Sequence, residues 1–295
     1  MRRRATFLSG LLLLLLLGCL CRPTPRPTSP PPGGTMRVVA LDIGQGDAIL
    51  IISPHGKSML VDGGNSSRDG REVILPYLRQ HGFERLDVMV LTHPDADHVG
   101  GLPTVLRGIP VEVIVSTGQV HTTQIYAEFL TEVKNARDKR GATVIKGVAG
   151  AEIPFDADVR VEVLAPSDAA IRGDDKNNAS IVLRLTYGAV SVLLTGDAEI
   201  EEESWLLKQG YDLAAQVLKV SHHGSHSGSG DAFLNAVHAE VGLISAGADN
   251  QYGHPHAEVL ERLARHGVQV YRTDQVGTIT VEIDGTGWRV IEDDR

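Results

Sequence analysis

The sequence predicts an α/β protein arranged as a four-layer αββα sandwich, and three observations support this. Short apolar runs typical of strands recur through both halves of the chain, between segments with helical spacing. Each half contains strands followed by a mixture of strands and helices, which favours two sheets packed back to back with helices outside. No short-period repeat and no linker divides residues 36–295, so they are expected to form one domain.

The strands are predicted from apolar or alternating runs bounded by turn residues. They are residues 36–43, 48–53, 59–61, 86–91, 111–115, 159–164, 181–185, 190–194, 217–220, 241–245, 268–271 and 277–283. The second and third are expected to form a hairpin. Helices are predicted where apolar residues recur at helical spacing. They are residues 71–81, 123–140, 198–209, 231–239 and 257–266.

The composition narrows the function. The formal net charge is −9, which excludes a strongly basic protein that wraps nucleic acid. The chain has two cysteines, Cys19 and Cys21, both near the start. The folded part therefore has neither a disulfide nor a thiolate metal ligand. Trp205 and Trp288 are interpreted as packing residues.

The N-terminal segment has the features of a targeting sequence. Three arginines precede an apolar run, and Leu16-Leu17-Gly18-Cys19 resembles a bacterial lipobox. We expect residues 1–18 to be a lipoprotein signal peptide and Cys19 to be lipidated. An ordinary signal peptide or a short membrane anchor is the alternative. Residues 19–35 are rich in proline and are expected to be an extended tether.

The run from His93 to His98 carries the strongest chemical pattern. It places His93, Asp95, Asp97 and His98 within six positions, directly after the apolar strand 86–91. Crowding four ionisable side chains is unfavourable unless a cation neutralises them. The pattern therefore predicts a metal site, and one loop that supplies so many ligands is suited to a dinuclear one.

Three further polar segments also follow apolar strands. They are Thr195-Gly196-Asp197, the segment 219–225 and the segment 250–256. Ligands of open α/β sheets bind at such strand ends. Seven of the 12 histidines lie in or directly beside these segments and the first loop, which indicates a site: His93, His98, His222, His223, His226, His254 and His256.

Together these motifs resemble the metallo-β-lactamase superfamily, and in particular the hydrolase domain of the competence DNA-uptake protein ComEC. The resemblance rests on the loop from His93 to His98, on Asp197 and on five further runs. These runs are LDIGQGDA at 41–48, VDGG at 61–64, NNAS at 177–180, SHHGS at 221–225 and YGHPH at 252–256. It spans residues 36–285 and implies the four-layer metallo-β-lactamase fold. The membrane channel of such proteins is absent, so their transport role is not carried over.

The resemblance implies a ligand set for two divalent ions, Zn²⁺ or Mn²⁺, with Fe²⁺ also compatible with its oxygen-rich donors. His93 and Asp95 would hold one ion, Asp97 and His98 the other, and Asp197 would bridge them. His222 is preferred over His223 as the remaining ligand of the second ion. Two departures stand out: Asp95 occupies a position where many members have histidine, and Asn178 lies where many supply another ligand.

The remaining expected roles complete the site. Asp62 would orient a ligand, and Asn178 or His223 would support the site or replace a ligand. Asp97, Lys219 and His254 are the expected catalytic residues. Lys219 and His254 would stabilise developing charge or donate a proton to the leaving group.

The leading hypothesis is a dinuclear metal-dependent hydrolase, tethered to a membrane outside the cytoplasm, that acts on phosphodiesters, with single-stranded DNA as one candidate substrate. The three carboxylates of the site carry less negative charge than two divalent ions carry positive charge. The remaining positive charge would attract an anionic ester. A lactone, thioester or β-lactam hydrolase is the first alternative. The second is a surface module that keeps the fold without catalysis. No obligate protein partner is expected.

Overall fold

The computed structural model describes residues 34–292. The predicted signal peptide (residues 1–18) and the lipidation residue Cys19 lie outside the described residues, as does most of the predicted tether (residues 19–35). Between residues 34 and 292, no helix combines the length and the apolar character that a membrane span requires.

The first sheet has eight strands in the order β14-β13-β1-β2-β3-β4-β5-β6. Its strands are β1 (Met36–Ala40), β2 (Ile49–Ile52), β3 (Ser58–Val61), β4 (Leu86–Leu91), β5 (Val111–Ser116), β6 (Thr143–Lys146), β13 (Ile279–Ile283) and β14 (Trp288–Glu292). Strands β3 to β6 run parallel, and the other pairs are antiparallel.

The second sheet has six strands in the order β12-β11-β10-β9-β8-β7. They are β7 (Val159–Ala165), β8 (Val182–Tyr187), β9 (Val190–Leu194), β10 (Val217–Lys219), β11 (Val241–Ile244) and β12 (Gln269–Arg272). Strands β9 to β12 are parallel, whereas β7, β8 and β9 pair antiparallel.

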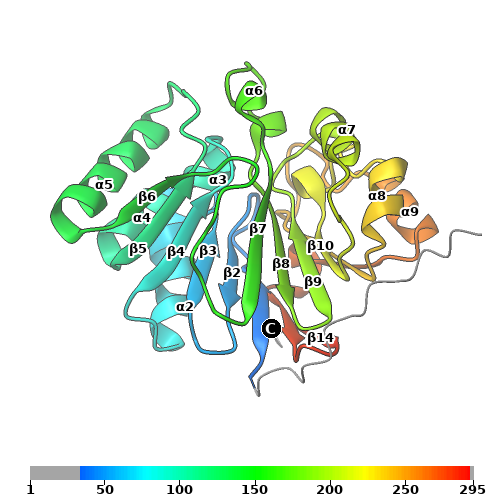
Figure 1. Ribbon diagram of the computed structural model, residues 1–295, viewed down its shortest axis with the longest axis horizontal. Coiled ribbons are helices and arrows are strands. Elements are labelled where there is room, and N and C mark those ends of the chain that lie inside the picture. Colours follow the sequence, from blue (N-terminus) through cyan, green and yellow to red (C-terminus); the bar gives the residue numbers. More distant parts are fainter. Residues whose placement is uncertain (1–33, 293–295) are drawn as a thin grey trace, which may run out of the picture. The chain divides into compact units, whose positions relative to one another are not determined.

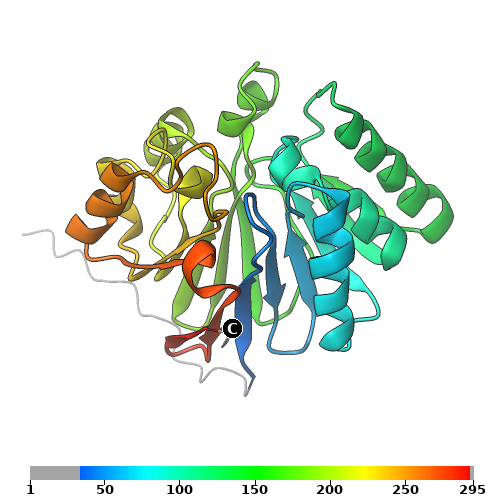
Figure 2. The same cartoon turned by 180° about the vertical axis from the view of Figure 1, so that it is seen from behind.

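Helices cover the outer face of each sheet (Figures 1 and 2). The first sheet carries α1 (Ser67–Asp69), the π-helix η1 (Gly70–Ile74), α2 (Leu75–Gln80), α3 (Ala96–Val99), α4 (Leu102–Gly108) and α5 (Gln124–Arg140). The second half contains α6 (Asp168–Ile171), the 3₁₀ turns η2 (Asn177–Ala179) and η3 (Ser221–Gly224), α7 (Ile200–Gln209), α8 (Asp231–Val237), α9 (Ala257–Arg265) and α10 (Thr273–Val276).

Three apolar clusters confirm the four-layer αββα sandwich. One lies between the sheets, one lies between the first sheet and its helices, and one lies between the second sheet and its helices. Strand β4 illustrates how one strand contributes to two of these clusters. Val88 and Val90 belong to the inter-sheet cluster, whereas Met89 and Leu91 face the helices. A strand buried on both faces needs a continuous apolar run, which is the pattern at 86–91.

The sheets bring the polar segments to one edge. Because β4, β9, β10 and β11 are parallel strands within their sheets, their carboxyl ends lead into loops on the same side. These loops begin at Thr92, Thr195, Val220 and Ser245. The turn after β1, which contains Asp47, reaches the same edge, since Asp47 N–H donates to the Asp97 carbonyl at 3.0 Å.

Candidate metal centre

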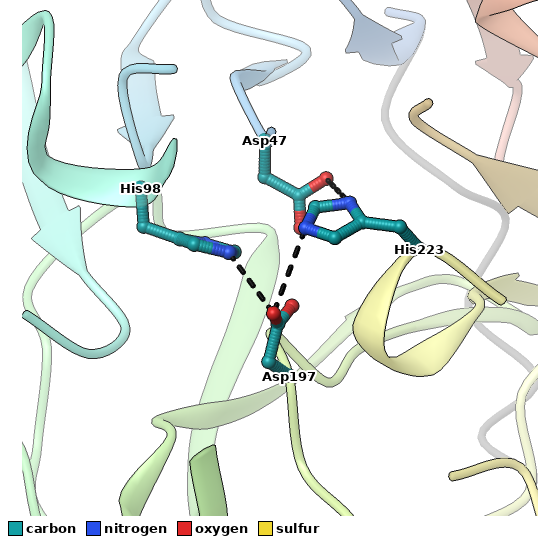
Figure 3. A group of neighbouring side chains, drawn as sticks. All are labelled: Asp47, His98, Asp197 and His223. Carbon is teal, nitrogen blue, oxygen red and sulfur yellow. Dashed lines mark ion pairs between the residues drawn. The ribbon is translucent and has the colours of Figure 1, made fainter. Parts of the chain in front are cut away.

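The centre is built around the Asp197 carboxylate, which is 2% exposed. Four imidazole Nε2 atoms lie within 4.0 Å of its Oδ2 atom. The distances are 3.2 Å for His98, 3.5 Å for His223, 3.6 Å for His222 and 4.0 Å for His93. These side chains come from the loops after β4, β9 and β10. Figure 3 shows His98 and His223 approaching Asp197, with Asp47 beside them.

Each of these four imidazoles is held from behind through its Nδ1 atom. His98 Nδ1 donates to Asp62 Oδ2 at 2.8 Å, and His222 Nδ1 donates to Glu199 Oε1 at 3.1 Å. His223 Nδ1 donates to the Ser245 carbonyl at 2.9 Å. A proton on Nδ1 leaves Nε2 as the free lone pair, which is the tautomer that binds a metal.

His93 is anchored through a relay of the same kind. The Thr92 hydroxyl donates to Asp62 Oδ2 at 2.7 Å, so its oxygen is left to accept from His93 Nδ1 at 3.1 Å. Asp62 also accepts the Thr92 backbone N–H at 2.8 Å. One buried carboxylate is thus linked to two of the four imidazoles, to His98 directly and to His93 through Thr92.

Other carboxylates complete the donor set. Asp97 Oδ2 lies 3.4 Å from His223 Nε2, and Asp95 Oδ2 lies 3.8 Å from His93 Nε2. Asp47 Oδ1 lies 3.6 Å from His223 Nδ1. Within the described chain, Asp47, His98, Asp197 and His223 form a fully buried group whose ligand atoms all lie within 4.8 Å of one another.

Several of these buried atoms have no hydrogen-bond partner among the described residues. They are Nε2 of His93, His98 and His223, and Oδ1 of Asp47 and Asp197. An unsatisfied buried polar atom costs about 1–3 kcal/mol, so five in one place require an explanation. Imidazole nitrogens and carboxylate oxygens that face a common point are the donors that divalent transition metals prefer. The residues present therefore fit a metal centre.

Burial and neighbouring charges also shift the pKa values of these residues. Burial lowers the pKa of His93 to about 3. Burial also opposes a charge on His98, but Asp197, Asp62 and Asp97 raise the pKa of His98 well above its usual value. Burial would raise the pKa of the Asp197 carboxyl, yet His98 and His223 hold it well below its usual range. Asp197 is thus an anion that needs positive charge around it.

The backbone adopts rare conformations to place these side chains. His222 and His223 are consecutive residues with left-handed φ values of 48° and 53°, and Asp62 has a φ of 61°. Such conformations cost about 1–3 kcal/mol for residues other than glycine and concentrate at functional sites. Here the two left-handed residues allow neighbouring rings from one turn to reach the same carboxylate.

Gly46 shows how closely the Asp47 loop is packed against the metal-binding loop. A Cβ atom on Gly46 would lie 2.2 Å from the Asp97 carbonyl oxygen, and the glycine φ is +123°. Only glycine fits this approach. The side chain of Asp47 is thereby fixed beside His223.

The structure brings together most of the predicted site residues. His93, Asp97, His98, Asp197 and both His222 and His223 meet at one point. The preference for His222 over His223 stays a prediction: the Nε2 atoms of both approach Asp197, and His223 belongs to the fully buried group. Asp95 lies at the edge, with 39% of its side chain exposed.

Two predicted residues lie differently from the sequence-based expectation. Lys219 is 1% exposed and pairs with Asp47 at 2.8 Å, so it does not reach a substrate, and we expect it to hold Asp47 in place. Asn178 accepts the backbone N–H groups of Glu199 and Glu202 at 3.1 Å each, so it caps helix α7. Half-buried His254 lies beside the histidine pair, its ring 5.5 Å from that of His222, and its expected role toward a substrate stays a prediction.

Three residues to which the sequence pattern assigns no role of their own lie at or beside the centre: Asp47, Glu199 and His121. His121 Nε2 lies 3.7 Å from Asp95 Oδ1. The signal for Asp47 was its place in the run LDIGQGD, whereas Glu199 and His121 are revealed only by the tertiary fold.

Asp62→Asn tests the orientation of the imidazoles. The change keeps the shape and the left-handed backbone that asparagine tolerates, but it removes the anion that holds His98 and Thr92. We expect metal affinity, measured by competition with a chelator, to fall about 10–100-fold. Asp249→Asn is the control, because exposed Asp249 also has a left-handed φ, of 55°. Equal affinity in both variants would contradict the role of Asp62.

Comparison with known proteins supports the assignment of the fold and the family. The family model described as the metallo-beta-lactamase superfamily matches residues 41–248. ComE operon protein 3 of Bacillus subtilis (strain 168) is 34% identical over 258 residues, which cover 81% of this chain and 32% of that protein. Competence protein ComA of Neisseria gonorrhoeae is 33% identical over 252 residues, covering 84% of this chain and 32% of that protein. The chain thus spans about a third of the length of these relatives.

One solved structure shares the fold at low sequence identity. Igni18, a metallo hydrolase from the archaeon Ignicoccus hospitalis KIN4/I, aligns with a TM-score of 0.53 and 16% identity, covering 84% of this chain and 99% of that one. The predicted resemblance to the hydrolase domain of ComEC-like competence proteins is confirmed by the curated relatives. With its matching family model, its four-layer fold and its buried Asp/His cluster, the chain belongs to the metallo-β-lactamase superfamily.

Proposed function

We propose that this protein is a dinuclear metal-dependent hydrolase that cleaves phosphodiesters. The observation that carries the proposal is the convergence of four imidazole nitrogens, each anchored through its other nitrogen, on the single carboxylate of Asp197. A structural histidine needs no such free lone pair in the interior of a protein. Four of them around one anion have a chemical purpose only if cations lie among them.

The donors divide naturally between two ions. His93, His222 and Asp95 would hold one ion, and His98, His223 and Asp97 the other, with Asp197 shared. In this assignment each of the neighbouring histidines serves a different ion, so the choice between His222 and His223 does not arise. Zn²⁺, Mn²⁺ and Fe²⁺ all suit a set of four imidazoles and three carboxylates. When bound, such ions supply Lewis-acid chemistry, activating water near neutral pH and stabilising charge on ester oxygens.

The charge of the centre favours an anionic ester. Asp95, Asp97 and Asp197 do not fully neutralise two divalent ions, and the charge of Asp47 is already offset by Lys219 at 2.8 Å. The remaining positive charge would attract a phosphodiester more strongly than a neutral lactone or β-lactam. The relative from Neisseria gonorrhoeae carries the name of a competence protein, which supports single-stranded DNA as one such substrate.

The residues at the rim would orient the substrate. Burial, and then the neighbouring histidines His222 and His223, lower the pKa of His254 to about 4, so its ring is neutral at pH 7. Its buried Nδ1 has no partner among the described residues. A neutral ring offers one N–H donor, and we propose that it donates a hydrogen bond to an ester oxygen on which charge develops.

Turnover tests the proposal directly. The full chain loaded with Mn²⁺ or Zn²⁺ should hydrolyse bis-p-nitrophenyl phosphate, and a chelator should abolish the activity. Asp197→Asn and Asp97→Asn should each lower kcat/KM by at least about 100-fold, because each removes a charged metal ligand. Nitrocefin and a lactone substrate are compared in parallel.

Asp158→Asn is the control for this experiment. Asp158 belongs to a second His/Asp group, with His55 and Asp156, that is not part of the centre. The activity of the Asp158→Asn variant should equal that of the wild type. Faster turnover of nitrocefin or the lactone than of the phosphodiester would replace the proposed substrate class. No turnover of any substrate by metal-loaded protein would favour a non-catalytic surface module.

We also propose that the enzyme is a lipoprotein held at a membrane outside the cytoplasm. The support is the sequence before residue 34, where a basic start and an apolar run lead to Leu16-Leu17-Gly18-Cys19. Cys19→Ser should release the protein into the soluble fraction, whereas Cys21→Ser should leave it with the membranes. Membrane retention of the Cys19→Ser variant, measured by fractionation and immunoblotting, would count against lipidation.

A further inference from the structure

Helix α7 begins with three consecutive glutamates whose environments differ. Glu203 is buried and accepts the backbone N–H groups of Ser229 and Gly230. Glu201 is exposed. Glu202 is 4% exposed, yet neither of its carboxyl oxygens has a hydrogen-bond partner among the described residues. A buried carboxyl with both oxygens unpaired is costly, and the contacts of the fold do not explain it.

The Glu202 side chain lines a pocket of about 160 Å³ between α6 and the first turn of α7. The other lining residues are Ser167, Ala170, Asn178, Glu201 and Trp205. Trp205 is half-buried and packs partly against the outer core of the second sheet. Its packing role is therefore real, but part of this side chain also forms a wall of the pocket.

The pocket adjoins the metal centre through the start of α7. Asn178 lines the pocket and accepts the backbone N–H of Glu199 at 3.1 Å. Glu199 in turn accepts from His222 Nδ1 at 3.1 Å. One face of this helical turn thus supports a metal-facing histidine, while Glu202 of the same turn faces the pocket.

The chemistry of the pocket excludes a phosphate group. Glu201 and Glu202 line it, and Asp175 is close enough to Glu202 to disfavour its charge. The two free oxygens of Glu202 call for a ligand with two adjacent N–H donors. The indole of Trp205 calls for a flat ring that can stack on it. Among the parts of a nucleic acid, the guanine base meets both requirements with its N1–H and 2-amino groups.

We propose that this pocket is a subsite for a guanine base of the substrate, with Glu202 accepting its N1–H and 2-amino hydrogens and Trp205 stacking on the ring. The proposal rests on the proposed function, since it adds a base-reading subsite to a centre that cleaves phosphodiesters. Burial, and then Asp175 and Glu203, raise the pKa of Glu202 well above its usual value. Two N–H donors would favour the ionised form and restore its acceptor capacity.

Nucleoside binding tests the subsite without any cleavage. Trp288→Phe leaves Trp205 as the only tryptophan of the full chain, and its indole N–H resonance is followed by NMR. Deoxyguanosine should shift the signal saturably and bind at least about fivefold more tightly than deoxyinosine, which lacks only the 2-amino group. Glu202→Gln should abolish this preference, because the NH₂ group of the glutamine amide would face an N–H donor of guanine instead of accepting a hydrogen bond from it. Glu201→Gln, the matched control, should keep it.

A second variant tests the pocket independently, in case Glu202→Gln fails to fold. Ala170→Leu fills the pocket from α6 and leaves Glu202 in place, so it should weaken the binding of both nucleosides. The subsite is refuted if the nucleosides do not saturate the signal, if they bind equally, or if Glu202→Gln keeps the preference. Saturation by ethanolamine instead would identify a pocket for an amine and would overturn the guanine assignment.

Steady-state kinetics distinguish the guanine subsite from the proposed phosphodiesterase activity. Glu202→Gln should leave the turnover of bis-p-nitrophenyl phosphate unchanged, because that substrate has no base. It should raise KM, with little change in kcat, for an oligonucleotide containing one guanine, and not for the same strand containing hypoxanthine. If no phosphodiester is cleaved at all, the proposed function fails, whereas the nucleoside measurement still decides the subsite.

Discussion

The anionic carboxylate of Asp197, buried among four imidazole nitrogens, is the constraint on which the architecture of the centre depends. A buried carboxylate is strongly unfavourable unless positive charge and hydrogen bonds surround it. The fold supplies no lysine or arginine to Asp197 among the described ion pairs, and places His98, His223, His222 and His93 there instead. The centre is stable only as a place for cations, either protons on imidazole or metal ions.

The rest of the structure can be understood as the means of holding these groups at fixed positions. Two sheets buried on both faces bring four strand ends to one edge. Behind the ligands, Asp62 and Glu199 fix ring orientations, and Lys219 neutralises Asp47. The left-handed turn at His222 and His223 stores backbone strain that the packing around it must offset.

The sequence predicted the parts of this centre whose signals are local. The loop from His93 to His98 holds four candidate ligands in six positions, and β4 is recognised by its unbroken apolar run. The edge strands β6 and β14 were not predicted. β6 is mostly exposed and lacks an apolar run, and the five residues of β14 mix apolar with charged side chains without a regular alternation.

Other features depend on tertiary contacts that spacing does not encode. His222 and His223 lie in a left-handed turn that spacing does not predict, so the sequence has no basis for separating the two. Lys219 looked available to a substrate because it ends a strand, but Asp47, 172 positions earlier in the chain, buries it in an ion pair. Glu202 looked like one of several acids at a helix start, and only its surroundings distinguish it.

Anomalous diffraction from crystals grown with Mn²⁺ or Zn²⁺ would locate the metal ions of the centre. We predict two peaks about 3.5–4 Å apart, with the Asp197 carboxylate between them and an imidazole Nε2 of the loop after β4 beside each. A single peak, or metal bound away from Asp197, would contradict it.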